Sequence, residues 1–269
     1  MKKTKPAGKT KPAQKKDSYL DKVREHYRTA QRSEVLAQQL LTDIMRRTGL
    51  PLNKILAAYS VCSDDANTMQ LHDPTHSLLG PFNLGGLNGY PFTGLTGMAA
   101  FAHHVPDDGA VLIFYAPHIG IAEDGTLGEI RRVGQNRKSS CCGAAKGALD
   151  KLTNEQIFPG DVFTADYQMN FIEQLFLSHE EQIQRADKPI KEATKVMYEA
   201  IDQRINAMVA QTQFHGKYLI LVGGIFINGD GRTNSFGVYE RYDIIEVEDR
   251  SKRKSMLKDF EKVCKTVLG

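Results

Sequence analysis

The sequence predicts an α/β protein in which a central mixed sheet, at least partly parallel, is flanked by helices. Short apolar runs that end at turn residues alternate with longer segments whose apolar residues recur at helical spacing. Such alternation is typical of a layered domain. A chain of 269 residues with 41% hydrophobic and 25% charged residues can bury a full core. We therefore expect a single α/β domain over residues 17–269.

The first 16 residues are rich in lysine, with seven lysines and no acidic residue. Because repeated like charges resist compaction, we expect a disordered tail over residues 1–16. A weak electrostatic tether to an acidic partner is the alternative. Without this tail the formal net charge changes from +3 to −4. We therefore expect no nucleic-acid partner for the folded part.

The sequence gives no sign of export or membrane insertion. No apolar region follows the first lysines, and no run approaches about 18 consecutive apolar residues. We expect no signal peptide, no membrane span and a cytoplasmic location, with a plastid or another organelle left open. The four cysteines, two of them adjacent, do not resemble a secreted disulfide framework. Reduced thiols are therefore expected.

The first folded segment, residues 17–50, is predicted to be helical. Its apolar residues recur at helical spacing, and Gly49-Leu50-Pro51 then ends the pattern. Residues 18–48 therefore form one broken helix or two consecutive amphipathic helices, which pack on the core or on a second subunit.

The remaining residues, 51–269, are predicted to hold the sheet and the other helices. Apolar segments bounded by turn residues predict strands over residues 55–62, 110–115, 129–133, 218–227 and 238–247. Helical spacing and segment length predict helices over residues 98–104, 143–152, 167–176, 196–208 and 252–267.

A glycine-rich segment lies over residues 80–97. It holds six glycines and two prolines, which is too many for a regular element. A phosphate cradle is not favoured, because the P-loop lysine is missing. We expect a shaped loop whose backbone passes close to a ligand, with Phe82, Tyr90 and Phe92 as an apolar wall for a substrate.

Three segments place a residue that zinc favours at the end of an apolar run or before a predicted helix: Cys62, His118 and the Cys141-Cys142 pair. Ligands beyond the carboxyl ends of neighbouring parallel strands converge on one crevice. Two cysteines and a histidine with an open fourth position suit a catalytic zinc ion. The spacings of 56 and 24 residues are not diagnostic. Inert buried cysteines with a core histidine are the alternative.

Several motifs between residues 60 and 147 resemble those of the limiting-CO2-inducible protein B/C family, which includes the theta-class carbonic anhydrases and is similar to the β-class enzymes. The motifs are Ser60-Val61-Cys62-Ser63-Asp64-Asp65, Gly-Pro-Phe-Asn-Leu-Gly-Gly-Leu from Gly80, Gly-Tyr-Pro-Phe-Thr-Gly from Gly89, Ala102-His103-His104-Val105-Pro106, Pro117-His118-Ile119-Gly120 and Cys141-Cys142-Gly143.

The resemblance implies a β-carbonic-anhydrase-like fold, a homodimer and a zinc ion held by cysteine, histidine and cysteine. Carried over by motif, Cys62 and His118 are zinc ligands, and the third comes from the cysteine pair. Cys142 is favoured because the β-class ligand also precedes a glycine, while Cys141 stays open. The resemblance then implies that residues 17–269 form a single zinc-binding domain, in which residues 51–269 are the catalytic core.

The resemblance also assigns catalytic residues. Asp64 follows the first cysteine by two positions, as the dyad aspartate does in β-class enzymes. The β-class arginine corresponds to Ala66 here, so the chain departs from the pattern, and Arg132 or Arg131 is the nearest replacement. His104 is expected to support the site or relay protons.

The function implied is a zinc carbonic anhydrase that interconverts CO2 and bicarbonate. Zinc lowers the pKa of its bound water to about 7, and the resulting hydroxide attacks CO2. One alternative is a catalytically silent, zinc-containing subunit that binds or scaffolds in response to bicarbonate or CO2. A second is a zinc hydrolase of small carbonyl or ester substrates.

Overall fold

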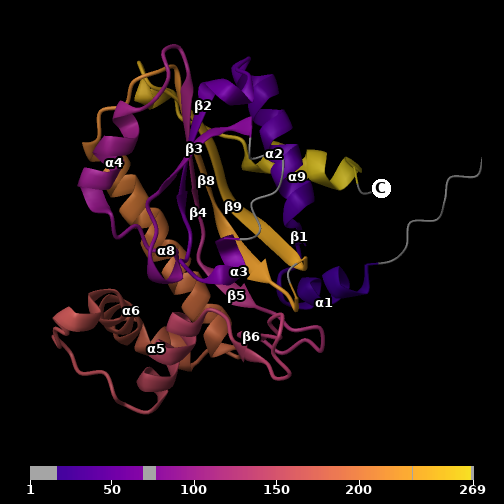
Figure 1. Ribbon diagram of the computed structural model, residues 1–269, viewed down its shortest axis with the longest axis vertical. Coiled ribbons are helices and arrows are strands. Elements are labelled where there is room, and N and C mark those ends of the chain that lie inside the picture. The colour runs from indigo at the N-terminus through magenta and orange to yellow at the C-terminus, as the bar shows by residue number, and fades with distance from the viewer. Residues whose placement is uncertain (1–16, 69–76, 232, 268–269) are drawn as a thin grey trace, which may run out of the picture.

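The structure is a computed structural model that describes residues 17–68, 77–231 and 233–267 (Figure 1). The predicted lysine-rich tail lies outside these residues. No helix among the described residues is long and apolar enough to cross a membrane.

The centre of the molecule is an eight-stranded mixed sheet, which confirms the predicted fold class (Figure 1). Its main order is β1-β9-β8-β4-β2-β3, with β5 paired to β8 and β10 to β9. Within the order β8-β4-β2-β3, neighbouring strands run parallel, whereas β9 is antiparallel to β8. The strands are β1 Gln31–Arg32, β2 Ile55–Ser60, β3 Leu79–Asn83, β4 Ala110–Tyr115, β5 His118–Gly120, β8 Tyr218–Asn228, β9 Ser235–Glu246 and β10 Lys254–Ser255. A separate two-stranded sheet joins β6 Glu129–Ile130 to β7 Ser139–Ser140.

Helices cover both faces of this sheet, so its central strands are apolar on both sides. In β4, Val111 and Ile113 pack on the layer of α4, α5, α6 and α8, while Leu112 packs on the opposite layer of α2 and α9. Side chains alternate along a strand, and burial on both faces explains the continuous apolar run. The helices are α1 Ser18–His26, α2 Ser33–Thr48, α3 Asp65–Thr68, α4 Gly94–His103, α5 Gly143–Thr153, α6 Tyr167–Leu177, α7 Glu180–Gln184, α8 Pro189–Gln211 and α9 Leu257–Val267.

The glycine-rich segment corrects one prediction. Residues 80–97 were expected to hold no regular element, but β3 covers its first residues and α4 begins at Gly94. β3 is an edge strand, and at an edge Pro81 can lack an N–H group without costing the sheet a hydrogen bond. Only the middle of the segment, around a short helical turn at Leu87–Gly89, is the expected shaped loop.

Other boundaries also differ from the predicted ones. The strand predicted to reach Cys62 ends at Ser60. The strand predicted over residues 129–133 is only the two residues of β6. The last helix begins at Leu257, because a short helical turn and β10 occupy the residues before it.

Candidate metal centre

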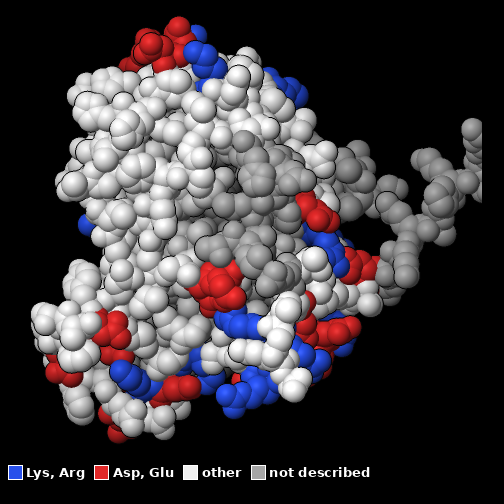
Figure 2. Space-filling view, in the orientation of Figure 1, with Lys and Arg blue, Asp and Glu red and all other residues white. Residues whose placement is uncertain are grey.

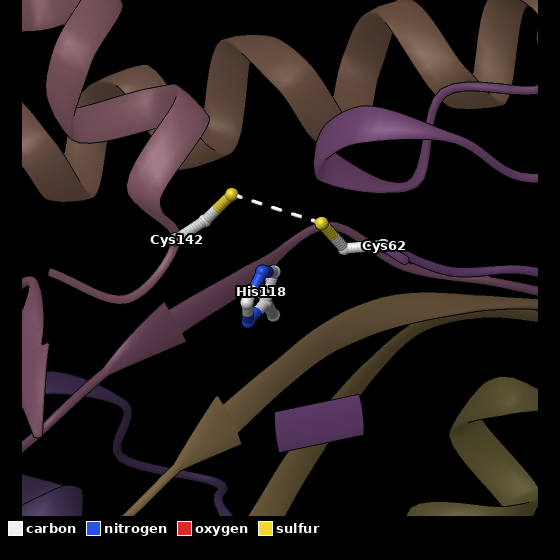
Figure 3. Close-up of side chains that lie close together, drawn as sticks. All are labelled: Cys62, His118 and Cys142. Carbon is white, nitrogen blue, oxygen red and sulfur yellow. Dashed lines mark hydrogen bonds between the residues drawn. The ribbon is translucent and has the colours of Figure 1, made fainter. Parts of the chain in front are cut away.

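The structure brings Cys62, His118 and Cys142 together at the carboxyl ends of the parallel strands (Figure 3). Cys62 follows β2, His118 begins β5, and Cys142 directly precedes α5. The sulfur atoms of the two cysteines are 3.9 Å apart. One potential ligand atom from each residue lies within 4.8 Å of the others, and all three side chains are buried. This group has the composition and proximity of a metal site.

The distance between the two sulfurs fits a tetrahedral metal ion. Two sulfurs on one zinc ion lie about 3.8 Å apart when each Zn–S bond is about 2.3 Å long. The observed separation of 3.9 Å between Cys62 and Cys142 is close to that value. Within the described residues, Nε2 of His118 is buried and has no hydrogen-bond partner. An unpartnered buried nitrogen is costly, and coordination to a metal would satisfy it.

Asn228, at the end of β8, fixes the orientation of the His118 ring. Its Oδ1 lies 2.7 Å from Nδ1 of His118, and its Nδ2 donates to the carbonyl of Ala66 at 3.1 Å. Because Nδ2 is the donor, Oδ1 accepts the Nδ1–H of His118, which leaves the lone pair on Nε2. A hydrogen bond of this kind sets the tautomer and direction of metal-binding histidines.

Cys141, which precedes Cys142 in the sequence, lies near Nδ1 of the His118 ring. Its Sγ is 3.5 Å from Nδ1 of His118 and 3.5 Å from Oδ1 of Asn228. Cys141 and His118 form a second potential metal group with Asp64. Because Nδ1 is already bonded to Asn228, the group that contains Cys142 can use the free ring nitrogen. Cys264, on α9, belongs to neither group, and its thiol donates to Oε1 of Gln39 on α2 at 2.9 Å.

The two thiols and the imidazole compete for protons in this buried space. Hydrogen bonding with Cys142 and burial raise the pKa of the Cys62 thiol. Burial lowers the pKa of His118, but the neighbouring Cys141 and Cys62 outweigh it, and the pKa lies above its usual value. The backbone N–H of Asn88 donates to Sγ of Cys62 at 3.1 Å. A divalent cation would reverse the preference for protons, because cysteine binds metals as the thiolate.

An ion pair between Asp64 and Arg132 lies beside the group. The guanidinium donates to both carboxylate oxygens, at 2.9 and 3.1 Å. The two side chains are 13% and 19% exposed, so the pair is largely shielded from water. Burial raises the pKa of Asp64, but the Ala66 N–H and Arg132 outweigh it and lower the pKa below its usual value. Figure 2 shows acidic and basic side chains next to one another in the region that Figure 1 labels β6.

The other predicted site residues are placed differently. Arg131 is exposed, and its backbone N–H, rather than its side chain, is bonded to Asp230. His104 is exposed at the end of α4, six residues before β4 begins. That position is at the amino end of β4, whereas the metal group is at the carboxyl end. The structure therefore does not bring His104 to the group.

The predicted aromatic wall is divided. Tyr90 and Phe92 contact each other, with ring centroids 4.9 Å apart, and both contact Phe171 of α6, at 4.2 and 5.6 Å. Phe82 instead packs against Phe101 of α4. The helical spacing that marks α6 predicts burial for Phe171 but not a place in this aromatic cluster.

Asn88 is a further residue that the sequence analysis missed. It lies in the turn Leu87–Gly89 and is fully buried, and neither atom of its side-chain amide has a hydrogen-bond partner among the described residues. Its backbone is in the left-handed region, with φ of 50°. A buried, unpartnered amide next to the candidate metal ligand Cys62 indicates a group that bonds to something the protein itself does not supply.

Comparison with known proteins identifies the family. The model described as limiting CO2-inducible proteins B/C beta carbonic anhydrases matches residues 34–246. The chain belongs to this family, and the resemblance of its motifs is confirmed. No curated protein matches the chain.

Solved structures of family members share the fold. The crystal structure of PtLCIB4, a homolog of the limiting CO2-inducible protein LCIB, has a TM-score of 0.78 at 25% identity and covers 88% of this chain and 98% of that chain. Its S47R mutant has a TM-score of 0.71 at 26% identity and covers 89% of this chain and 98% of that chain. LCIB itself gives 0.67 at 16% identity, with 90% and 98% covered, and indicates the fold alone.

Proposed function

We propose that this protein is a zinc carbonic anhydrase that interconverts CO2 and bicarbonate. One observation carries the proposal: a buried group of Cys62, His118 and Cys142 lies beside the Asp64–Arg132 ion pair in a chain of the beta carbonic anhydrase family. The three residues of the group would hold the zinc ion. When bound, zinc supplies the Lewis acidity that makes water a nucleophile near neutral pH.

Asp64 orients the attacking water. An ionised carboxylate only accepts hydrogen bonds, so it directs the donor O–H of water toward itself and the lone pair toward carbon. Arg132 and the Ala66 N–H keep the carboxylate ionised, because they lower its pKa. Asp64 lies close enough to His118 to belong to a potential metal group with it. Arg132 binds both carboxylate oxygens, which would keep Asp64 from coordinating the metal and leave it free to orient water.

The turn that carries Asn88 contributes the substrate side of the site. Tyr90 and Phe92 follow this turn in sequence and, with Phe171, form an apolar cluster suited to CO2, which has no hydrogen-bond donor. The unpartnered Asn88 amide supplies an N–H for an oxygen of bicarbonate. The same turn donates a backbone N–H to Cys62, so the substrate surface and a metal ligand are held together. A homodimer and a cytoplasmic location complete the proposal.

Metal analysis together with a CO2 hydration assay tests this function. Protein purified without chelators should contain about one zinc ion per chain and accelerate acidification of CO2-saturated buffer. Cys62→Ser should lose the metal and the activity. Cys264→Ser is the matched control and should keep both, because Cys264 lies in neither metal group.

The outcomes separate the alternatives. Folded protein without metal would overturn the proposal. A zinc-loaded protein that does not hydrate CO2 would instead support a silent subunit that responds to bicarbonate or CO2. Hydrolysis of a small ester without CO2 hydration would favour a zinc hydrolase.

A further inference from the structure

The arginine of the ion pair comes from a short hairpin that needs support from elsewhere. Arg132 lies two residues after β6, and each strand of the hairpin β6–β7 has only two residues. Two-stranded hairpins of this size are marginally stable on their own. The base of the hairpin is attached to the sheet, because the Cys141 N–H donates to Gly128 and the Gly120 N–H donates to Cys141. Arg132 lies farther along the hairpin, between β6 and β7, where these bonds do not hold it.

The turn that follows β8 fixes the residue directly before Arg132. Oδ1 of Asp230 accepts the backbone N–H of Arg131 at 2.7 Å, and the N–H of Gly231 donates to the carbonyl of Arg131 at 3.0 Å. Asp230 and Gly231 therefore bond to both the N–H and the carbonyl of Arg131. The second oxygen of Asp230 accepts the N–H of Glu123 at 3.2 Å. One carboxylate thus joins two segments of the loop that leads to Arg132.

The position of Asp230 is itself fixed by the first helix. The Tyr19 hydroxyl of α1 accepts the backbone N–H of Asp230 at 2.6 Å and donates to the carbonyl of Ile121 at 2.7 Å. The backbone passes so close to this hydroxyl at Gly229 that a Cβ there would lie 2.7 Å from the tyrosine oxygen. Asn228, which orients the candidate metal ligand His118, is only two residues before Asp230.

We propose that Asp230 is a positioning residue that holds the backbone before Arg132, so that the guanidinium stays on both oxygens of Asp64. This inference rests on the proposed function for its effect on catalysis. The residues from Asn228 to Gly231 then support two parts of the site, the imidazole of His118 through Asn228 and the ion pair through Asp230. Neither Asp230 nor Tyr19 contacts the substrate or the metal in this arrangement.

Asp230→Ala tests the inference, and Asp124→Asn is the matched control. Asp124 pairs with Lys138 of the same loop at 2.7 Å, so its variant also removes one negative charge there but leaves the Arg131 backbone bonded. Asp230→Ala should lower kcat/KM for CO2 hydration by about 10-fold, the lower end for partners that orient a site from outside, with zinc content unchanged. Asp124→Asn should stay within about twofold of the wild type.

Two further measurements separate positioning from a general structural role. In an Arg132→Ala background, Asp230→Ala should add less than about a twofold loss, because both changes act through one guanidinium. Amide hydrogen exchange over residues 129–140 should be about 10-fold faster in Asp230→Ala. In Asp124→Asn it should change by less than about twofold, because the pair that Asp124 forms with Lys138 lies at the surface and contributes little. Tyr19→Phe, which keeps the ring, should show a smaller change in the same direction and replaces Asp230→Ala if that variant does not fold.

The exchange measurement needs no enzyme activity, so the two proposals fail separately. If the wild type does not hydrate CO2, the proposed function fails, and faster exchange over residues 129–140 still supports positioning by Asp230. If the wild type is active and Asp230→Ala retains its rate and its protection, the inference alone is overturned. A full 10-fold loss in the Arg132→Ala background would also overturn it, because Asp230 would then act through another residue.

Discussion

Replacing Arg132 by alanine should reduce CO2 hydration about as strongly as the loss of Asp64 itself. Arg132 makes two hydrogen bonds to Asp64, at 2.9 and 3.1 Å, between side chains that are 19% and 13% exposed. A hydrogen bond to a charged group contributes about 1.5–3 kcal/mol, and partial exposure favours the lower end. The two bonds together then contribute about 3 kcal/mol. Since about 1.4 kcal/mol corresponds to a tenfold change in rate, kcat/KM should fall roughly 100-fold.

The adjacent arginine provides the control for this experiment. Arg131→Ala removes an equal charge from the same loop, while the hydrogen bonds of Arg131 to the turn after β8 are made by its backbone and remain. This variant should retain a rate close to that of the wild type. Zinc content should be equal in all variants, which shows that the loss of rate does not come from loss of metal.

Stopped-flow measurement of CO2 hydration for Arg132→Ala, Asp64→Ala and the double variant decides whether the pair acts as a unit. The double variant should lose little more than either single variant, because each single change already removes the oriented carboxylate. Losses that add in full, or an Asp64→Ala enzyme with the wild-type rate, would refute the role given to the pair.

Two further predictions concern the metal ligands and the stability of the fold. Cys142→Ser should lose most bound metal and Cys141→Ser should keep more than half, measured by elemental analysis, and the reverse result would exchange the two cysteines. Asp43→Asn should lower the free energy of unfolding at pH 7 by about 2–3 kcal/mol, because the buried carboxylate accepts hydrogen bonds from Arg47 and Tyr242. Burial raises the pKa of Asp43, but its arginine partners outweigh burial, so the pKa in the folded protein lies below its usual value. The stabilisation by the Asp43 carboxylate is therefore complete above the unfolded pKa of about 3.9 and is lost as the pH falls below that value. Denaturant titrations at several pH values should therefore show a deficit that shrinks below about pH 4, and a deficit that stays constant there would contradict this account.

The fold could be predicted where local sequence carries the information. The strand predicted over residues 110–115 is β4, with the same bounds, and that predicted over 218–227 is β8 with one residue added. Both are central strands, whose burial on two faces leaves a continuous apolar run. The edge strand β3 was missed because an edge tolerates glycine and proline, which usually mark loops.

The site could be predicted only in part for a similar reason. Cys62 and His118 are visible in the sequence because their side chains suit metal binding and each ends an apolar run that predicts a strand. Asn228 and Asp230 carry no such signal, because their roles depend on β8 lying beside β5, and pairing between strands is not written in local sequence. His104 was chosen for its motif, but α4 places it at the opposite end of β4.

The departure from the β-class pattern has a structural consequence. Ala66 stands where the local arginine is expected, and the arginine that pairs with Asp64 comes from 68 residues away. The hairpin that carries Arg132 also leads, through β7, directly to Cys141 and Cys142. The guanidinium of Arg132 further donates to the carbonyl of Ser140, the last residue of β7, at 3.3 Å. One hairpin therefore carries the partner of Asp64 and leads to the candidate ligand Cys142. The hydrogen bonds of Cys141 to Gly120 and Gly128 hold the base of this hairpin without Arg132, so loss of the ion pair should leave Cys142 in place.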